Sequence, residues 1–567
     1  MPRQSSRRSI FLIIAGLLVA VVVVAVVLPR GSAEPPPAGP TVPANVSAQA
    51  LAKQVCRSVD PVVLQRVDNG TFIGRSGDIQ LIPHEPNFVD GGLTHASPFA
   101  LTQHVPLLLY GPGYVRPGVY DRPAHLTDLA PTASDLVKFD GFQAPDGRAL
   151  DEGLLPASAR PTPRLVVTLI WDSAGMDLLH RWPGTWPTLA AMAKQGAWFT
   201  HATVGASPSN TPPSHATIGT GAYPREHGMT DEYEMIAGAL VKPNDNGPGA
   251  MVEPTFADVY DVAKGNRPLV AEMGSLSAHI MMMSHGLQYT GGDADIAVAR
   301  EVPDAATAGD DAGSEWSLTG AMAPYYTFPS YANDPKNEVV FDEAKQELDQ
   351  SDGKLDGKWR DQSIEGMRDG FNTPARTPYQ TALFEEVIRR EGFGADPIPD
   401  LLYLNYKMID TLGHQFSADG VEMSDALKVQ DDNLRTFVRF LNEQVGRGKW
   451  VMLLTADHGM QRDPKVTGAF PIDIDDLEAS VDRVFGDHVV IKARPTQMWL
   501  NEDELAANGF TLDEVSEFLR SLNEGDTVGA MQPAPGHEDD RVFDAVFPAT
   551  MLGDLPCLPD AADTQGG

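Results

Sequence analysis

Three short stretches of the sequence combine carboxylates and imidazoles in a way that could bind metal ions. Asp172 directly follows one apolar run, and Asp410 and His414 follow a second one as Asp-Thr-Leu-Gly-His. Asp457 and His458 follow a third run, as Asp-His-Gly-Met. Carboxylate oxygens mixed with imidazole nitrogens suit zinc, with manganese as the second choice. One Asp after a strand is usually a cap or turn residue, but three such ends, two of them with a His, favour a metal site.

A hydroxyl that could act beside these ligands belongs to Thr211, in the sequence Asn-Thr-Pro-Pro-Ser-His. A Thr at the N-cap with Pro at the first helical position is a strong signal for the start of a helix. Such a hydroxyl would lie at the positive end of the helix dipole, where phosphate binds readily. Taken alone, this element is more simply an ordinary helix cap.

The elements that must position these residues are buried strands with helices between them. Near-continuous apolar runs of this kind predict an α/β fold with a parallel sheet covered on both faces. Functional residues of such sheets gather beyond the carboxyl ends of the strands. The runs lie at residues 106–110, 165–170, 401–404, 450–454 and 489–491.

Composition limits the class of protein further. The chain has 567 residues, with 43 Lys and Arg against 77 Asp and Glu, which gives a formal net charge of −34. This acidity argues against nucleic-acid binding, which needs a basic surface. It is compatible with a phosphate-handling enzyme whose positive charge comes from metal ions. The sequence gives no indication of the oligomeric state.

The N-terminus has the pattern of a targeting segment. Arg3, Arg7 and Arg8 precede an uncharged apolar run over residues 10–28, which as a helix would span about 28 Å, close to the thickness of a bilayer core. Residues 1–33 are therefore either an uncleaved signal anchor or a cleaved signal peptide. We expect an exported catalytic body, held at the cell membrane by one span or secreted after cleavage. A Pro-rich tether is predicted over residues 34–50.

As a set, these motifs resemble the alkaline phosphatase superfamily, and most closely its type I phosphodiesterase/nucleotide pyrophosphatase branch. The resemblance covers most of residues 55–560 and includes a Tyr-Pro-Arg-Glu-His-Gly-Met stretch at residues 223–229. It implies a three-layer α/β/α sandwich with a mostly parallel central sheet, and Thr211 as the nucleophile. It also implies two zinc ions. One would be held by Asp172, Thr211, Asp457 and His458, and the other by Asp410, His414 and one further His.

That further His does not lie where the family has it. Downstream of the Asp-His-Gly motif the chain offers only His488 and His537, and neither has the family's context. The context occurs near the N-terminus instead, around His95 in Gly-Gly-Leu-Thr-His-Ala-Ser-Pro. We therefore expect His95 to be the ligand and the chain to be circularly permuted. Residues 51–155 would supply the usual end of the fold, and residues 160–560 its beginning, with cap or insert loops around 230–400. A tandem second copy is the alternative, but nothing before Asp172 resembles a nucleophile or an Asp-His pair.

The permutation has a consequence for the cysteines, of which the chain has two, Cys56 and Cys557. The unpermuted order would run from the region of one directly into the region of the other. The two residues should then be neighbours, and export would let them form a disulfide.

Within the family, the substrate is expected to be a small phosphate ester or a nucleotide. Ser214 stands where diesterases commonly carry a phosphate-binding Asn, and Ser277 and His279 stand where monoesterases carry a Lys and an Arg. A third departure is Asp231, in an acidic stretch unfavourable to a dianion. These departures favour a phosphodiesterase or nucleotide pyrophosphatase. The alternatives are a phosphomonoesterase, a phosphonate hydrolase and an inactive exported scaffold.

Overall fold

The structure is a computed structural model that describes residues 47–90, 92–242, 249–275, 281–300, 316–318, 320–526 and 533–558. Its largest element is an eight-stranded sheet in the order β12-β11-β15-β6-β16-β3-β7-β4. The strands are β3 (Leu107–Tyr110), β4 (Gly118–Tyr120), β6 (Leu165–Trp171), β7 (Ala197–Phe199), β11 (Val270–Met273), β12 (Ile296–Val298), β15 (Asp400–Tyr406) and β16 (Trp450–Thr455). The predicted strands at 106–110, 165–170, 401–404 and 450–454 are all present in it.

The sheet is mixed rather than purely parallel. Strand β6 runs parallel to β15 on one side and to β16 on the other, and every residue of these three strands is buried. Strand β3 runs antiparallel to both of its neighbours, β16 and β7. The sheet is therefore mostly parallel, as the resemblance implied, and β3 is the strand that runs in the opposite direction. An apolar run reveals burial on both faces of a sheet, but it carries no information on strand direction.

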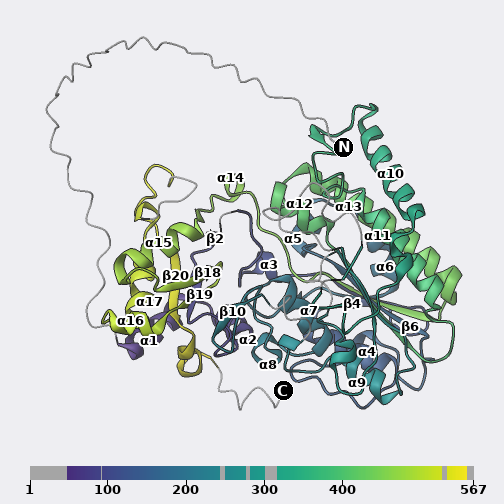
Figure 1. The fold of residues 1–567 in the computed structure, drawn as a ribbon, viewed down its shortest axis with the longest axis horizontal. Coiled ribbons are helices and arrows are strands. Elements are labelled where there is room, and N and C mark those ends of the chain that lie inside the picture. The colour runs from purple at the N-terminus through teal and green to yellow at the C-terminus, as the bar shows by residue number, and fades with distance from the viewer. Residues whose placement is uncertain are drawn as a thin grey trace, which may run out of the picture. The chain divides into compact units, whose positions relative to one another are not determined.

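Helices cover both faces of this sheet (Figure 1). One group consists of α6 (Pro187–Gln195), α11 (Arg376–Glu391) and α13 (Val421–Leu441), and the other of α4 (Leu129–Leu136), α7 (Thr211–Thr220) and α9 (Phe256–Ala263). Helix α13 contacts α6 and α11, whereas α4, α7 and α9 contact one another. This is the predicted α/β/α layering, and its core unites the sheet with both helical layers.

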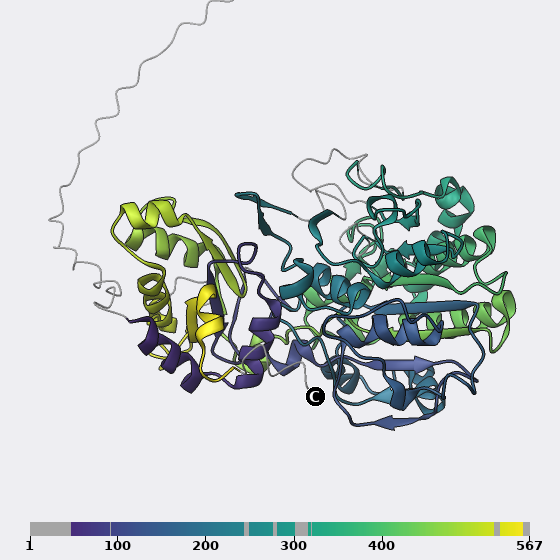
Figure 2. The same ribbon diagram turned by 90° about the horizontal axis from the view of Figure 1, so that it is seen from below.

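A smaller antiparallel sheet has the order β18-β19-β1-β20, and Figure 2 shows it beside the larger one. Its strands are β1 (Ile79–Pro83), β18 (Val490–Arg494), β19 (Gln497–Leu500) and β20 (Phe543–Pro548). The run at 489–491 thus belongs to this sheet and not, as expected, to the main one. Strand β1 buries Leu81 against the helices α15 (Ile474–Phe485) and α17 (Leu512–Arg520). The next residue, Ile82, faces α1 (Ala48–Ser58) and α2 (Pro61–Gly70), as the two-residue period of a strand requires.

The remaining elements connect these layers. They are α3 (Ala100–Gln103), α5 (Met176–Arg181), α8 (Pro224–His227), α10 (Pro335–Asp349), α12 (Met408–Phe416), α14 (Pro464–Thr467), α16 (Glu502–Ala507), β2 (Phe88–Val89), β5 (Ala124–His125), β8 (Ala202–Thr203), β9 (Glu234–Ile236), β10 (Ala239–Val241), β13 (Lys358–Trp359), β14 (Gln362–Ser363) and β17 (Pro471–Ile472). The range 230–400, expected to hold cap or insert loops, also supplies two strands of the main sheet, β11 and the edge strand β12.

The N-terminal expectations fall mostly outside the described residues. The apolar run at 10–28 and most of the tether lie before residue 47, where the description begins. Helix α1 already starts at Ala48, capped by the Ser47 side chain, so the last residues of the predicted tether are helical. Among the described residues, no helix is both long and apolar enough to cross a membrane.

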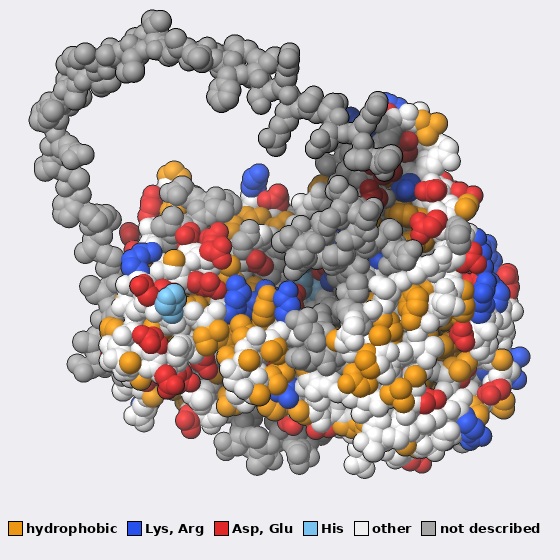
Figure 3. Space-filling view, viewed as in Figure 1, with side chains coloured by type: hydrophobic (Ala, Val, Ile, Leu, Met, Phe, Trp, Pro, Cys, Tyr) orange, Lys and Arg blue, Asp and Glu red, His pale blue; other side chains and the backbone are white. Residues whose placement is uncertain are grey.

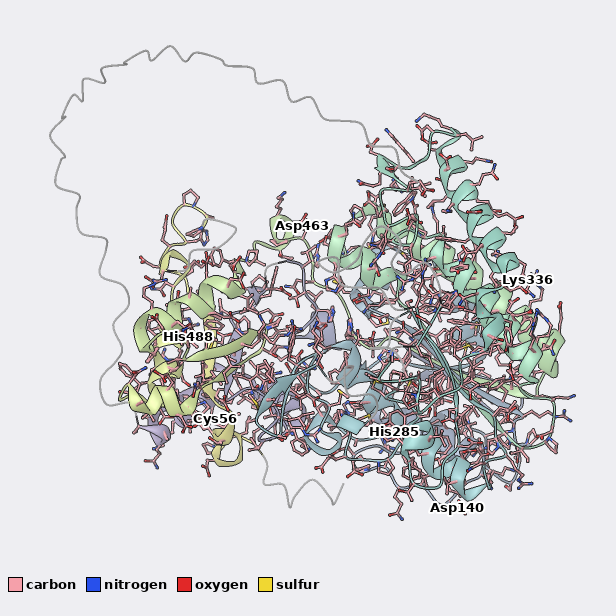
Figure 4. The ribbon with its side chains drawn as sticks, in the orientation of Figure 1. Cys56, Asp140, His285, Lys336, Asp463 and His488 are labelled. Carbon is pink, nitrogen blue, oxygen red and sulfur yellow. A yellow bond between two sulfur atoms is a disulfide. The ribbon has the colours of Figure 1, made fainter. Side chains whose placement is uncertain are left out.

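Cys56 and Cys557 form a disulfide that joins helix α1 to the C-terminal part of the described chain. Figure 4 labels Cys56 beside the smaller sheet. The two Cα atoms lie 5.7 Å apart although 501 positions separate the residues in the sequence. The predicted proximity of the two cysteines is confirmed.

Replacing both cysteines by serine is expected to lower the midpoint of thermal unfolding. A cross-link that closes so long a loop removes conformational entropy from the unfolded chain, worth about 5 kcal/mol in chain-entropy models. Differential scanning calorimetry of the oxidised protein and of the double variant measures the effect. A reducing agent should shift the natural protein toward the variant and leave the variant unchanged. Equal midpoints for the two oxidised proteins would contradict the expectation.

Candidate active site

Three carboxylates meet at one edge of the main sheet. Asp172 follows β6, Asp410 lies in α12 just after β15, and Asp457 follows β16. Because these strands are parallel neighbours, their carboxyl ends share an edge. The three residues are at most 1% exposed. The predicted convergence of the three strand ends is what the structure shows.

Asp172, Asp457 and His458 form the first cluster of candidate metal ligands. The Nε2 atom of His458 lies 3.3 Å from Asp457 Oδ2 and 3.7 Å from Asp172 Oδ1. Thr211 joins them, with its Oγ1 atom 3.2 Å from His458 Nε2. The four residues expected to hold one ion are thus brought together.

His95, Asp410 and His414 form the second cluster. The Nε2 atoms of His95 and His414 each lie 3.5 Å from Asp410 Oδ1. His95 comes from the segment before α3, more than three hundred positions from the other two residues. Its ring stacks on that of His458 with centroids 3.7 Å apart, so the two clusters adjoin.

These donor atoms fit divalent ions. Two ligands of a tetrahedral zinc lie about 3.3 Å apart when each metal–ligand distance is about 2.0 Å, and the spacings above are of that size. The Oδ2 atom of Asp457 is buried and finds no hydrogen-bond partner among the residues that the structure describes, as expected for an atom that binds a metal instead.

The imidazole rings of the two clusters are oriented so that they can bind metal ions. The Nδ1 atoms of His95, His414 and His458 each lie 2.7–2.9 Å from a backbone carbonyl oxygen, of Ser209, Leu93 and Gly459 respectively. A ring that donates from Nδ1 keeps Nε2 free to accept a metal. Burial lowers the pKa of His95 well below its ordinary value, and burial also lowers the pKa of His458. Both rings are therefore neutral near pH 7, the form that binds metal ions.

Thr211 begins helix α7, but it is not the N-cap. Asn210 holds that position, and its side-chain amide donates to Asp231 Oδ1 at 2.8 Å instead of capping the helix. The expected N-cap assignment of Thr211 was therefore one residue too late, because the second of the two polar residues before the prolines already has helical geometry. Its hydroxyl still lies at the positive end of the helix dipole. Ser214, one turn on, is 2% exposed and its Oγ atom has no hydrogen-bond partner among the described residues.

Lys407 was missed by the sequence reasoning. It follows β15 directly, and its Nζ atom lies 3.1 Å from Thr211 Oγ1, 3.1 Å from Asp172 Oδ1 and 2.8 Å from Asp410 Oδ2. Burial lowers the pKa of Lys407, but Asp172, Asp410 and Asp457 outweigh it and raise the pKa above its ordinary value. The signal was available, since a lysine directly after a buried strand reaches the same edge as the ligands.

Two further polar residues support the carboxylates. Ser173, with a left-handed backbone φ of 64°, donates from Oγ to Asp410 Oδ1 at 2.7 Å and from its amide to Asp457 Oδ1 at 3.1 Å. Asn405 donates to Asp172 Oδ2 at 2.9 Å. His215 is buried as well, with its Nδ1 atom 2.8 Å from the Thr211 carbonyl oxygen.

The rival histidines lie elsewhere. His537 is exposed and paired with Asp540, at 2.7 Å, and His488 is exposed as well. Ser277 and His279, the positions compared with monoesterases, lie outside the described residues. Asp231 is fully buried, and Arg494 contacts both it and Glu232, at 3.4 and 2.8 Å. Arg494 therefore offsets part of the negative charge of this acidic stretch.

The sequence profile of the type I phosphodiesterase / nucleotide pyrophosphatase family matches residues 166–534. This chain belongs to that family. Alkaline phosphatase PafA of Elizabethkingia meningoseptica is 24% identical over 410 residues, covering 65% of this chain and 74% of PafA. The crystal structure of wild-type PafA gives a TM-score of 0.48 at 19% identity, covering 64% of this chain and 77% of PafA. Phosphonoacetate hydrolase from Sinorhizobium meliloti 1021, in complex with phosphonoformate, gives 0.38 at 15% identity, covering 69% and 82%.

Replacing His95 by alanine is expected to remove about one equivalent of bound metal per chain, because the second cluster would keep only two ligands. His537→Ala is the matched control, and it should leave the metal content unchanged. Both variants are loaded with zinc, desalted and measured by inductively coupled plasma mass spectrometry. Equal losses in the two variants, or a loss in His537→Ala alone, would contradict the assignment.

Proposed function

We propose that this protein hydrolyses phosphate monoesters, first transferring the phosphoryl group to Thr211 and then to water. The observation that carries the proposal is the ammonium group of Lys407, which touches the Thr211 hydroxyl and two of the buried carboxylates. The family supplies the broader class, a metal-dependent hydrolase of phosphate esters.

Thr211 is placed to attack phosphorus. In the first step its Oγ1 atom loses a proton to solvent and bonds to phosphorus while the bond to the ester oxygen breaks, and the released oxygen takes a proton from solvent. In the second step, water cleaves the bond between phosphorus and Oγ1, which frees phosphate and restores the hydroxyl. Two divalent ions, zinc or manganese, would supply positive charge at the attacking and leaving oxygens when bound.

Each cluster has a defined part in this proposal. Asp172, Asp457 and His458 would hold an ion beside Thr211, whereas Asp410, His414 and His95 would hold the other. Lys407 donates to the attacking oxygen and stays protonated because of its carboxylate neighbours. Ser214, on the first turn of the same helix, would offer its free hydroxyl to a phosphate oxygen.

The charge of the substrate is the reason to prefer a monoester. A monoester carries more negative charge than a diester, so it gains more from an additional cation. Lys407 provides that cation at the nucleophile, and Arg376 lies nearby, with its guanidinium 3.3 Å from the hydroxyl of Thr411. Burial is the largest influence on the pKa of Arg376 and helps lower it to about 9, while Asp172 and Asp410 act to raise it. The arguments for a diester weaken because Arg494 offsets part of the negative charge around Asp231.

The second candidate is hydrolysis of phosphate diesters or nucleotide pyrophosphates. It is favoured by the family match, which spans most of the chain. A phosphonate hydrolase would use the same groups. An inactive scaffold is disfavoured because all seven expected site positions are filled and six of them are buried.

Turnover of p-nitrophenyl phosphate should exceed that of bis(p-nitrophenyl) phosphate for the zinc-loaded protein, and Thr211→Ala should abolish both. Lys407→Met should lower kcat/KM for the monoester about 100-fold and for the diester less than about 10-fold, since one preorganised donor is commonly worth that much. The matched control is Lys354→Met, which removes an exposed lysine paired with Asp352. Faster diester turnover with equal losses in Lys407→Met would instead support the diesterase.

We also propose that the chain is a circular permutant of the family's usual order, with residues 51–155 and 160–560 as its two portions. The family profile begins only at residue 166, yet the preceding segment supplies β1, β3, β4 and His95. The disulfide holds the two ends of this arrangement together.

A relinked chain tests the permutation. A short linker joins residue 558 to residue 51, the chain is opened in the exposed stretch 157–159, and the cysteines become serine. We expect this variant to fold and to keep Thr211-dependent turnover within about 10-fold, because termini near one another at the surface tolerate relinking. An equally long linker with the chain opened inside β6 is the control and should not fold. Failure of both variants would count against the proposal.

We propose export to the outer face of the cell membrane because residues 10–28 form an uncharged apolar run and because the chain has a disulfide, a bond that persists in oxidising compartments. Fractionation of cells that express the full chain tests it. Activity accessible to a substrate that cannot cross the membrane supports export, and activity found only after lysis contradicts it. Acidic side chains are scattered over the face drawn in Figure 3, in keeping with a small-molecule substrate and no nucleic-acid partner.

A further inference from the structure

A third group of carboxylates lies away from Thr211. Asp261, in helix α9, and Asp293 and Asp295, just before β12, each offer one oxygen, and these oxygens all lie within 4.8 Å of one another. Strand β12 runs parallel to β11, which runs parallel to β15. The cluster therefore lies at the amino edge of the sheet, whereas Thr211 and the metal-ligand candidates lie at the carboxyl edge.

Asp261 is the member that most needs a partner. It is 4% exposed, and within the described part of the chain its Oδ1 atom has no hydrogen-bond partner. The charged groups that act on it are Asp293 and Asp258, both negative. Burial first and these two carboxylates second raise the pKa of Asp261 to about 7, and burial also raises the pKa of Asp295 well above its ordinary value. A buried carboxylate surrounded only by other carboxylates is costly in free energy.

The basic side chain of His285 is already paired with Asp258. His285, labelled in Figure 4, lies with its Nδ1 atom 2.7 Å from Asp258 Oδ2, and its amide donates to Asp258 Oδ1 at 2.7 Å. The amide of Thr255 donates to the same carboxylate at 2.8 Å. Asp258 is thus satisfied by His285 and by backbone amides, and among the described residues the charged groups that act on Asp261 and Asp295 are carboxylates.

The backbone around the cluster is held independently of any ion. The side chain of Asn266 donates to the carbonyl oxygen of Gly291 at 3.0 Å. The backbone amide of Asn266 donates to the carbonyl oxygen of Asp261 at 3.0 Å. The Asp295 carbonyl accepts from the Thr327 amide at 2.8 Å. The end of α9 and the loop before β12 are therefore tied together with their carboxylates converging.

We propose that Asp261, Asp293 and Asp295 bind a divalent cation, with calcium preferred. An all-oxygen set without His or Cys suits the hard cations calcium and magnesium. Opposite ligands lie about 5 Å apart across calcium and about 4.2 Å apart across magnesium. Oxygens that lie within 4.8 Å of one another come onto one calcium ion with small side-chain rotations, whereas the shorter bonds to magnesium need larger ones. The ion would link α9 to β12, the edge strand of the main sheet, and thereby stabilise that edge.

Calcium binding is measured on the full chain with its zinc sites loaded, after passage over a chelating resin followed by restoration of stoichiometric zinc. Titration with calcium chloride in a calorimeter should show one site per chain. At saturating calcium the midpoint of thermal unfolding should rise by about 2 °C or more, with a smaller rise for magnesium. Absence of both binding heat and a thermal shift would overturn the proposal, and a larger shift with magnesium would overturn the calcium preference.

Asp261→Asn separates a cation site from a merely acidic cluster. It keeps the shape of the side chain and removes the repulsion, so this variant should be at least as stable as the natural protein without calcium. It should bind calcium at least 10-fold more weakly and show no thermal shift. Asp352→Asn, an exposed carboxylate paired with Lys354, is the matched control and should keep the full response.

His95→Ala should also keep the calcium response, because the cluster lies at the opposite edge of the sheet from His95. A calcium shift that survives in Asp261→Asn, or that disappears in His95→Ala, would place calcium elsewhere and overturn the proposal.

Discussion

The negative charge of Asp172, Asp410 and Asp457 is the constraint on which the rest of the site depends. These carboxylates end adjacent strands and are almost fully buried, and isolated charges in such places are costly in free energy. Lys407 supplies one positive charge, and three imidazoles supply nitrogens to the same two clusters. One ammonium leaves most of the negative charge unbalanced. Two of the three negative charges stay unbalanced, and this charge favours the binding of divalent cations by the two clusters of candidate ligands.

The fold meets this constraint by drawing on distant parts of the chain. The parallel strands bring the three carboxylates to one edge, whereas His95 arrives from the N-terminal segment. One local contact ties that segment to the nucleophile, since the His95 ring donates to the carbonyl oxygen of Ser209, two residues before Thr211. The hydroxyl of Ser209 in turn donates to the His95 carbonyl at 2.6 Å. The second metal cluster and the start of helix α7 are therefore positioned together.

Much of the site could be predicted because most of its residues directly follow strands that the local sequence pattern identifies. Strands such as β6 and β15 are recognisable as apolar runs, and the residue after each run must lie at the carboxyl edge of the sheet. His95 could be placed only through its resemblance to a family motif, because no local pattern links it to Asp410. The antiparallel direction of β3 and the placement of residues 489–491 in the smaller sheet depend on long-range pairing, which periodicity does not encode. The N-cap was misplaced by one residue because Asn210 and Thr211 are both good caps.

Lys407 shows a different limit of sequence reasoning. The residue was visible, but its role depends on three side chains from separate strand ends that converge only in the folded protein. The same holds for Arg494, which offsets part of the charge of an acidic stretch that the sequence alone suggested would repel a dianion. Charge complementarity across distant segments exists only in the folded protein, and a motif read position by position could not supply it.

The central claim is that the two clusters of candidate ligands each bind a divalent ion. An anomalous difference map from crystals of the zinc-loaded protein, recorded at the zinc absorption edge, tests it most directly. The account predicts one peak about 2 Å from His95 Nε2 and Asp410 Oδ1, and a second at the same distance from His458 Nε2 and Asp457 Oδ2. A map without peaks at these positions, with Lys407 still bridging Asp172 and Asp410, would contradict the account.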